Sequence, residues 1–276
     1  MDGICQGKLG RLACHLHIFD TCFPLESALF ASLWSEPSDA DARLRALFSS
    51  YEIILVFSFS RQLEEAIRKI SERTVFRISP RPPVHQRIHV TQFILDQFAA
   101  YGLLRAGKFA FPEKKQDRVS FSKKILIHPG SGSPRKNWPI DRFIHVYENL
   151  KSEGREPEFI IGPAEDFLTK KLEGRPAHCA SDLTDLTGMM KNAAGYIGND
   201  SGLSHLAAFL GLPVTVIFGP SDPLRWKPVG NVRVLRPCDP ECNPCFETEK
   251  ENCANPVCLY RISADTATCM VREMAG

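Results

Sequence analysis

The chain has 276 residues, of which 43% are hydrophobic and 24% charged, and this length corresponds to about two domains. Lys and Arg (34) nearly balance Asp and Glu (32), which excludes a polycationic nucleic-acid binder and a disordered chain. No apolar run approaches the roughly 20 residues of a membrane span, and polar residues interrupt any export signal near the first residue. We therefore expect a soluble cytoplasmic protein without a nucleic-acid partner.

The first part of the chain, residues 1–115, is predicted to be a partial α/β domain. Residues 53–57 are apolar throughout, as in a buried strand of a parallel sheet, and residues 63–70 have helical spacing. Residues 75–78 and 90–104 are the next predicted strand and helix. Residues 1–50 show no clear periodicity, so no element is assigned there.

A charged stretch without apolar periodicity, residues 113–122, is predicted to be a linker to a second domain at 122–276. In this second part, strands and helices alternate regularly. The predicted strands are 125–127, 159–161, 196–198 and 214–218, and the predicted helices are 139–150, 167–172, 186–193, 203–210 and 264–274. This alternation predicts a parallel sheet covered by helices.

Three loops that follow predicted strands of the second part carry candidate ligand-binding residues. The first loop contains Gly130, Ser131, Gly132 and Ser133, followed by Lys136. Glycine and serine let backbone N–H groups and hydroxyls approach an anion, and the lysine adds positive charge, so a diphosphate is the predicted ligand. A solvated turn contains the same residue types, and the loop alone does not separate the two readings.

The second loop, residues 162–166, contains Glu165, whose carboxylate is placed to accept hydrogen bonds from a ribose or a base. A carboxylate in the first turn of a helix is also stabilised by the helix dipole. Glu165 is therefore open to both a binding and a structural interpretation.

The third loop joins a predicted strand to a predicted helix and contains Asp200, Ser201, Gly202 and His205. Unpaired N–H groups at the start of the helix would face the same crevice as the first loop. An ordinary helix cap with a packed histidine explains these residues one at a time, but explains less well why they gather opposite a loop rich in glycine, serine and lysine.

Ordered motifs in the second part resemble glycosyltransferase family 9, the ADP-heptose:lipopolysaccharide heptosyltransferases. The motifs are 127–133 (Ile-His-Pro-Gly-Ser-Gly-Ser), 136–139 (Lys-Asn-Trp-Pro), 198–208 (Gly-Asn-Asp-Ser-Gly-Leu-Ser-His-Leu-Ala-Ala) and 218–223 (Phe-Gly-Pro-Ser-Asp-Pro). The resemblance implies a GT-B fold of two Rossmann-like domains with parallel sheets, the first of them incomplete here. It also implies metal-independent, inverting transfer of a heptose or related sugar from an ADP-sugar to a lipopolysaccharide core or other lipid-linked saccharide. The acceptor implies peripheral contact with the inner face of the cytoplasmic membrane, and no cofactor is needed for the chemistry.

The resemblance also implies roles for the loop residues. Lys136 and Asp200 are the candidate catalytic residues, with Lys136 on the donor diphosphate. The candidate substrate-binding residues are Gly130, Ser131, Gly132, Ser133, Glu165, Ser201, Gly202 and His205. Among these, Ser131 and Ser133 would line the phosphates and Glu165 would face the nucleoside.

The sequence departs from the family at the acceptor side. Members of the family open with an apolar strand that leads into a Gly-Asp pair, whose aspartate is the expected general base. No such strand followed by Gly-Asp occurs in this sequence, and Asp20, after residues 16–19 as a possible strand, is the nearest substitute. Two other functions therefore stay open: a nucleotide-sugar-binding protein without activity, and a sugar-nucleotide epimerase of the same fold.

The chain has ten cysteines, and a cluster near the end includes Cys242, Cys245, Cys253 and Cys258. A Cys-x2-Cys turn followed by a second pair can hold a tetrahedral ion, so the four residues are a candidate structural zinc site. Disulfides, an iron–sulfur cluster and plain thiols are the alternatives. The cysteines outside the cluster are scattered, as in a reducing compartment.

Overall fold

The computed structural model describes residues 1–34, 40–105, 122–179, 182–237, 244–247, 253 and 257–276. The chain divides into two compact units, Met1–Phe109 (unit 1) and Ala110–Gly276 (unit 2). The predicted linker at 113–122 lies outside the described residues except for Ser122. Among the helices that are described, none is long and apolar enough to cross a membrane.

Unit 2 contains a six-stranded parallel sheet. Its strands are β5 (Lys124–His128), β6 (Glu156–Ile161), β7 (Ala177–Cys179), β8 (Gly195–Asn199), β9 (Val214–Ile217) and β10 (Val232–Leu235), in the order β10-β9-β8-β5-β6-β7. From β5 the chain builds outward through β6 and β7, and from β8 it builds outward in the other direction. The two central strands, β5 and β8, therefore flank the point at which the strand order reverses.

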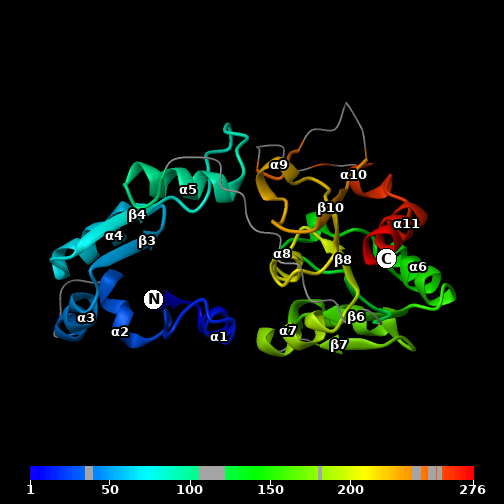
Figure 1. The fold of residues 1–276 in the computed structure, drawn as a ribbon, viewed down its shortest axis with the longest axis horizontal. Coiled ribbons are helices and arrows are strands. Elements are labelled where there is room, and N and C mark those ends of the chain that lie inside the picture. The colour runs from blue at the N-terminus through cyan, green and yellow to red at the C-terminus, as the bar shows by residue number, and fades with distance from the viewer. Residues whose placement is uncertain (35–39, 106–121, 180–181, 238–243, 248–252, 254–256) are drawn as a thin grey trace. The chain divides into compact units, whose positions relative to one another are not determined.

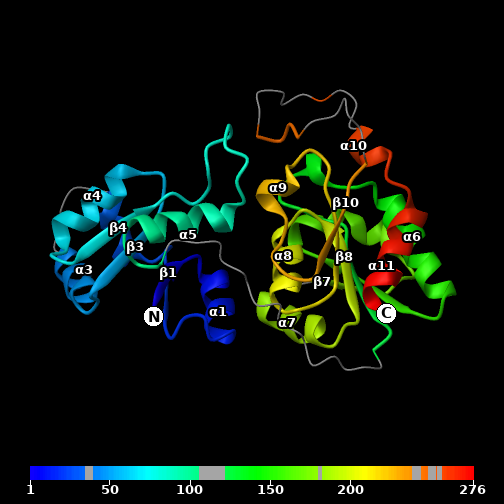
Figure 2. The same cartoon turned by 45° about the horizontal axis from the view of Figure 1, so that its top comes forward.

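Helices cover both faces of this sheet. They are α6 (Ile140–Ser152), α7 (Leu183–Lys191), α8 (Gly202–Phe209), α9 (Pro223–Trp226), α10 (Val257–Tyr260) and α11 (Ala264–Ala275), with 3-10 segments η2 (Pro134–Lys136) and η3 (Pro163–Leu172). On one face, α6 and α11 lie side by side (Figures 1 and 2) and bury Phe143, Val146 and Val271 against the sheet. On the other face, α7 and α8 contribute Met190 and Ala207 to a second apolar layer.

The predicted strands and helices of unit 2 are confirmed within a few residues, except that 167–172 is the end of the 3-10 segment η3. Two strands were not expected, β7 and β10. They are the two edge strands and are only three and four residues long, which is too short for a periodic pattern to show.

Unit 1 holds two separate parallel pairs of strands. Its elements are β1 (Gly3–Cys5), α1 (Gly7–His15), β2 (Cys22–Pro24), α2 (Ala28–Ala31), η1 (Ser32–Trp34), α3 (Ala40–Ser49), β3 (Ile53–Phe57), α4 (Arg61–Ile70), β4 (Thr74–Ile78) and α5 (Val90–Ala100). Strand β1 pairs with β2, and β3 pairs with β4. A small core forms around Phe30, Leu44, Phe48, Ile67 and Val75. The predicted elements over 53–104 are confirmed, whereas residues 16–19 form a turn and a bend after α1 and not the possible strand.

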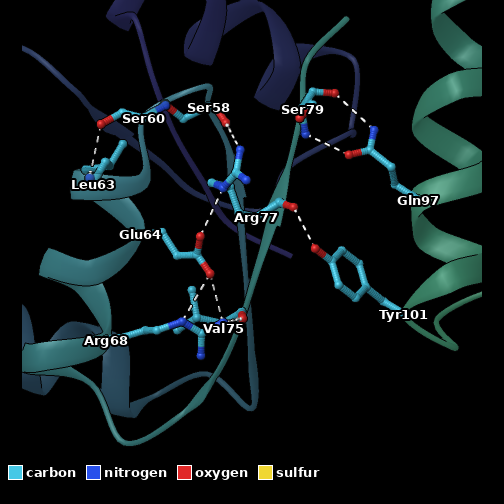
Figure 3. Close-up of polar contacts among 10 residues, drawn as sticks. All are labelled: Ser58, Ser60, Leu63, Glu64, Arg68, Val75, Arg77, Ser79, Gln97 and Tyr101. Carbon is cyan, nitrogen blue, oxygen red and sulfur yellow. Dashed lines mark hydrogen bonds and ion pairs between the residues drawn. The ribbon is translucent and has the colours of Figure 1, made fainter. Parts of the chain in front are cut away.

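Polar contacts tie β3 and β4 to α4 (Figure 3). The Glu64 carboxylate accepts hydrogen bonds from Arg68 Nε at 3.1 Å and from Arg77 Nε at 3.0 Å. Arg77 also donates to the backbone carbonyl of Ser58 at 3.4 Å. One carboxylate on α4 thus joins its own helix to β4, and through Arg77 to the end of β3.

Candidate functional site

The candidate site lies at the carboxyl ends of β5 and β8. These strands are direct neighbours, with His128 opposite Gly198 in the register. In open parallel sheets, ligands bind outside the carboxyl ends of the strands where the strand order reverses. The first and third candidate loops follow these two strands, so the fold brings them together.

Asn199, the last residue of β8, fixes both ends of the first loop. Its Nδ2 donates to the carbonyl of Pro129 at 2.7 Å, and its Oδ1 accepts from the backbone N–H of Trp138 at 3.0 Å. Asn199 is fully buried, where an unpaired backbone group would be costly. The sequence reasoning passed over Asn199, although it stands inside the third motif next to Asp200.

Within the first loop, Ser131 holds the turn. Its Oγ lies 2.7 Å from the carbonyl of Ser133 and 2.6 Å from Asn137 Oδ1, and it accepts the N–H of Ser133 at 3.2 Å. At Gly132 a Cβ would meet no atom within 4 Å, and this glycine is exposed. The loop therefore combines an internally bonded serine with an open backbone that a ligand can approach.

Glu165 connects the second loop to the first. Its Oε2 accepts the backbone N–H of Gly162 at 2.6 Å, and its side chain is buried. A Cβ added at Gly130 would stand 2.3 Å from Glu165 Oε1. Glycine at position 130 thus leaves room for the carboxylate, which a side chain there would push aside. The structural interpretation of Glu165 is supported, and its contact with a nucleoside stays a prediction.

Lys136 and Asp200 come together across the site. Lys136 Nζ lies 3.2 Å from Asp200 Oδ2, and both side chains are largely buried. Lys136 belongs to η2 after β5, and Asp200 precedes α8, so the ion pair joins the first and third loops. The ammonium group is held beside the start of α8.

Phe246 covers the positive end of the first loop. Its ring centroid lies 5.0 Å from Lys136 Nζ and 5.3 Å from the Arg135 guanidinium carbon. The backbone N–H groups of Cys245 and Phe246 donate to the carbonyl of Pro220 at 2.8 and 3.0 Å, which positions the ring. The sequence gives no local signal for this contact, because the partners are more than 100 residues apart.

The start of α8 is built on buried polar groups. Ser201 caps the helix, and its Oγ lies 3.4 Å from His128 Nδ1 and 3.3 Å from Ser204 Oγ. Burial lowers the pKa of His128 to about 4, so the imidazole is neutral near pH 7. Positive charge at the site therefore comes from Lys136 and the helix N–H groups and not from His128.

The two remaining candidates of the third motif stand in the first turn of α8. Gly202 is its first residue and is exposed, and a Cβ there would meet no atom within 4 Å. His205 is half-buried, and its backbone N–H donates to the carbonyl of Ser201 at 3.3 Å. The structure thus gathers every predicted loop residue of unit 2 at the carboxyl ends of the strands of the sheet.

Asp20, the substitute base, lies in unit 1 just before β2, at the amino end of that strand. Its carboxylate is mostly exposed and forms an ion pair with the N-terminal amine of Met1. The carboxyl end of a strand, where a base would meet an acceptor, is the opposite end. Nothing in this geometry supports Asp20 as a base.

The proposed zinc ligands are described only in part. Cys245 is half-buried, Cys253 is exposed and Cys258 is buried, whereas Cys242 lies outside the described residues. Among the residues whose placement is described, no group of three or more His, Cys, Asp or Glu side chains is arranged to hold a metal ion. The four-thiolate site stays a prediction.

Comparison with known proteins shows the family. The family model for glycosyltransferase family 9 (heptosyltransferase) matches residues 103–254, more than half of the chain. Lipopolysaccharide heptosyltransferase 3 of Escherichia coli strain K12 is 28% identical over 113 residues, which are 38% of this chain and 33% of that protein. The matched segment spans only 33–35% of the length of the curated relatives.

Solved structures resemble the chain over nearly its whole length. A family 9 glycosyl transferase from Veillonella parvula has a TM-score of 0.73 at 16% identity, over 99% of this chain and 87% of that chain. The ADP-heptose lipopolysaccharide heptosyltransferase II of E. coli also has a TM-score of 0.73 at 16% identity, over 99% and 88%. These likenesses confirm the predicted GT-B fold with parallel sheets. Together with the match of the family model, they identify the chain as a member of glycosyltransferase family 9.

Proposed function

We propose that this protein transfers a heptose or a related sugar from an ADP-sugar to a lipopolysaccharide core or another lipid-linked saccharide. The transfer would be inverting and independent of metal, at the inner face of the cytoplasmic membrane. The observation that carries the proposal is the Lys136–Asp200 ion pair beside the start of α8, at the reversal point of the sheet. The names of the family and of the E. coli relative supply the sugar and the acceptor class.

The donor chemistry follows from the charges at this edge. In the reaction, the bond between the anomeric carbon and the diphosphate oxygen breaks while the acceptor hydroxyl oxygen bonds to the opposite face of that carbon and releases its proton to the solvent. The leaving diphosphate gains negative charge, which Lys136 and the positive dipole end at the start of α8 stabilise. Asp200 holds the ammonium group in place before the donor arrives, so little reorganisation is needed.

The loops would divide the donor between them. Gly132 and Ser133 present backbone to the phosphates, and Gly202 lets the donor approach the helix start closely. Glu165, held against Gly130 and Gly162, closes the side toward the nucleoside. Ser201 and His205 lie on the sugar side, at the first turn of α8. His128 is neutral and therefore adds no charge, and its imidazole lies within contact distance of the Ser201 hydroxyl.

The test of the donor site is isothermal titration of ADP and ADP-heptose into the full chain and into Lys136→Ala. Loss of a charge-assisted contact should weaken ADP binding at least tenfold, since about 1.4 kcal/mol corresponds to a factor of ten. Lys123→Ala is the matched control, because Lys123 is exposed just before β5, at the opposite edge of the sheet. Equal binding by Lys136→Ala and the parent would contradict the donor site.

A second candidate function is nucleotide-sugar binding without transfer. The favouring observation is that the described residues of unit 1 form two separate strand pairs, and that Asp20 stands at the wrong end of β2 for a base. Release of ADP from ADP-heptose in the presence of a lipopolysaccharide acceptor separates the two functions. Binding without release would support this second function, and a converted donor without acceptor would indicate an epimerase.

A further inference from the structure

Strand β3 has one edge that no described strand pairs with. The N–H of Ser58 donates to the carbonyl of Ile78 in β4 at 3.1 Å. Because the backbone groups of successive strand residues point to alternate sides, those of Ile53, Leu55 and Phe57 face away from β4. Their side chains are 47%, 36% and 51% exposed, unusual for an apolar strand of a parallel sheet, which is normally buried on both faces.

The other edge of this pair is covered. On β4, Tyr101 Oη of the α5 end donates to the carbonyl of Arg77 at 3.0 Å (Figure 3). Gln97 of α5 accepts the N–H of Ser79 at 2.8 Å and donates to its carbonyl at 3.1 Å. Covering an edge with a helix is a common protection against unwanted pairing. Within the described part of unit 1, the β4 edge is covered and the β3 edge is open.

Strand β1 also has an open edge. The N–H of Gly3 donates to the carbonyl of Thr21, and the carbonyl of Cys5 accepts the N–H of Leu25, both at 2.9 Å. These residues therefore face β2, and the backbone groups of Ile4 face the other way. Among the described strands, β1 has only β2 as a partner.

Both open edges line one apolar pocket of about 590 Å³. Gly3 and Ile4 of β1 lie on its wall together with Ile53, Leu55 and Phe57 of β3. At one end, Tyr51 Oη donates to Asp2 Oδ2 at 2.5 Å, which brings the amino ends of β1 and β3 together. The pocket thus has unpaired backbone groups on two sides and apolar side chains between them.

We infer that this pocket receives an extended apolar strand, which pairs with β1 on one side and β3 on the other. The completed sheet has the order β2-β1-strand-β3-β4. In a doubly wound sheet the middle position belongs to a strand that pairs with a neighbour on each side, so the occupant is an extended apolar segment whose backbone groups are free at both edges. A small apolar ligand would fill a pocket of this size, but it would leave the backbone N–H and C=O groups of both edges unpaired.

The test uses the full chain and the peptide acetyl-Lys-Val-Ile-Val-Leu-Val-Lys-amide, with backbone amide hydrogen exchange as the readout. Strand pairing should slow exchange at least tenfold at Ile4, Leu55 and Phe57, whose N–H groups face the pocket. The amides of Ile54 and Val56 already face β4 and should change little. A peptide with proline at positions 3 and 5 lacks the N–H groups that pair and should give no protection.

Phe57→Lys should weaken peptide binding at least tenfold. Phe209→Lys, at a phenylalanine on α8 of unit 2 that is also exposed (42% against 51% for Phe57), is the matched control and should bind like the parent. Binding without slower exchange at Leu55 and Phe57 would identify an apolar ligand site and overturn the proposal. Protection of these amides that rises with protein concentration and needs no peptide would show pairing between two copies, and it would overturn the proposal as well. Absence of any binding would do the same.

Discussion

The six-stranded sheet of unit 2 and the β3-β4 pair of unit 1 contain similar strands with different surroundings. In unit 2, Ile125, Leu126 and Ile127 of β5 are 0% exposed, because β6 and β8 pair with both edges and helices cover both faces. In unit 1, the equally apolar strand β3 has one neighbour and remains about half exposed over Ile53 and Phe57. An apolar sequence therefore shows that a strand can be buried. Whether the strand is buried depends on the strands that pair with its two edges and on the helices that cover its two faces.

The largest difference is expected for matched isoleucines in the two sheets. Ile127→Ala should lower the free energy of unfolding of unit 2 by about 2–5 kcal/mol, because it leaves a cavity in a closed core. Ile53→Ala should lower that of unit 1 by less than about 1 kcal/mol, since a half-exposed side chain loses little burial. Calorimetry of the full chain measures both transitions, with amide exchange assigning each to its unit. Equal losses would contradict the comparison.

Acid should separate the two units. Because burial lowers the pKa of His128 to about 4 from 6.5, the unfolded chain binds the proton more readily than the folded chain. The stability of unit 2 is therefore complete above pH 6.5 and falls as the pH drops toward 4, by about 3 kcal/mol at most. Denaturant unfolding between pH 7 and 4 measures this loss. His128→Gln should flatten the dependence of the stability of unit 2 on pH. His17→Asn, at an exposed position of unit 1, should leave this dependence unchanged.

Two amide side chains bind backbone groups at strand ends, one in each unit. Asn199→Asp replaces the group that donates to Pro129 by a buried carboxylate oxygen, and it should cost about 2 kcal/mol and weaken ADP binding. Gln97→Glu makes the same change at Ser79 beside β4, where the side chain is partly exposed, and it should cost less than about 1 kcal/mol. Urea unfolding of both variants measures the two free-energy losses, and a larger loss for Asn199→Asp would show that the loops of unit 2 depend more on their bridging amide.

The smallest expected difference concerns two crowded glycines. Gly130→Ala forces the Glu165 carboxylate aside and should cost about 1 kcal/mol, whereas Gly132→Ala, in open space, should cost almost nothing. In unit 1, a Cβ at Gly3 would meet the Phe19 ring, which lines the pocket and has room to turn. Gly3→Ala should therefore cost less than Gly130→Ala, as thermal unfolding of each unit would show. A larger loss for Gly3→Ala would indicate that the pocket is filled in solution.

The fold of unit 2 could be predicted because its strands are continuous apolar runs and its helices end at glycines such as Gly211. Its site could be predicted because strand ends at the reversal point must meet. The bridging by Asn199 and the cover by Phe246 could not, because both are tertiary contacts without a local pattern. In unit 1, β1 and β2 have only three residues each, so no alternation marks them, and residues 16–19 were wrongly taken as a possible strand.

The contact between Gly130 and Glu165 also constrains how this family member can diverge. A side chain gained first at position 130 meets the carboxylate at once, whereas the same gain after Glu165 has been replaced by alanine avoids these nearest contacts. The two substitutions are thus tolerated in one historical order and disfavoured in the other. In lineages that keep the glutamate, packing alone therefore favours glycine at position 130, whatever ligand the site binds.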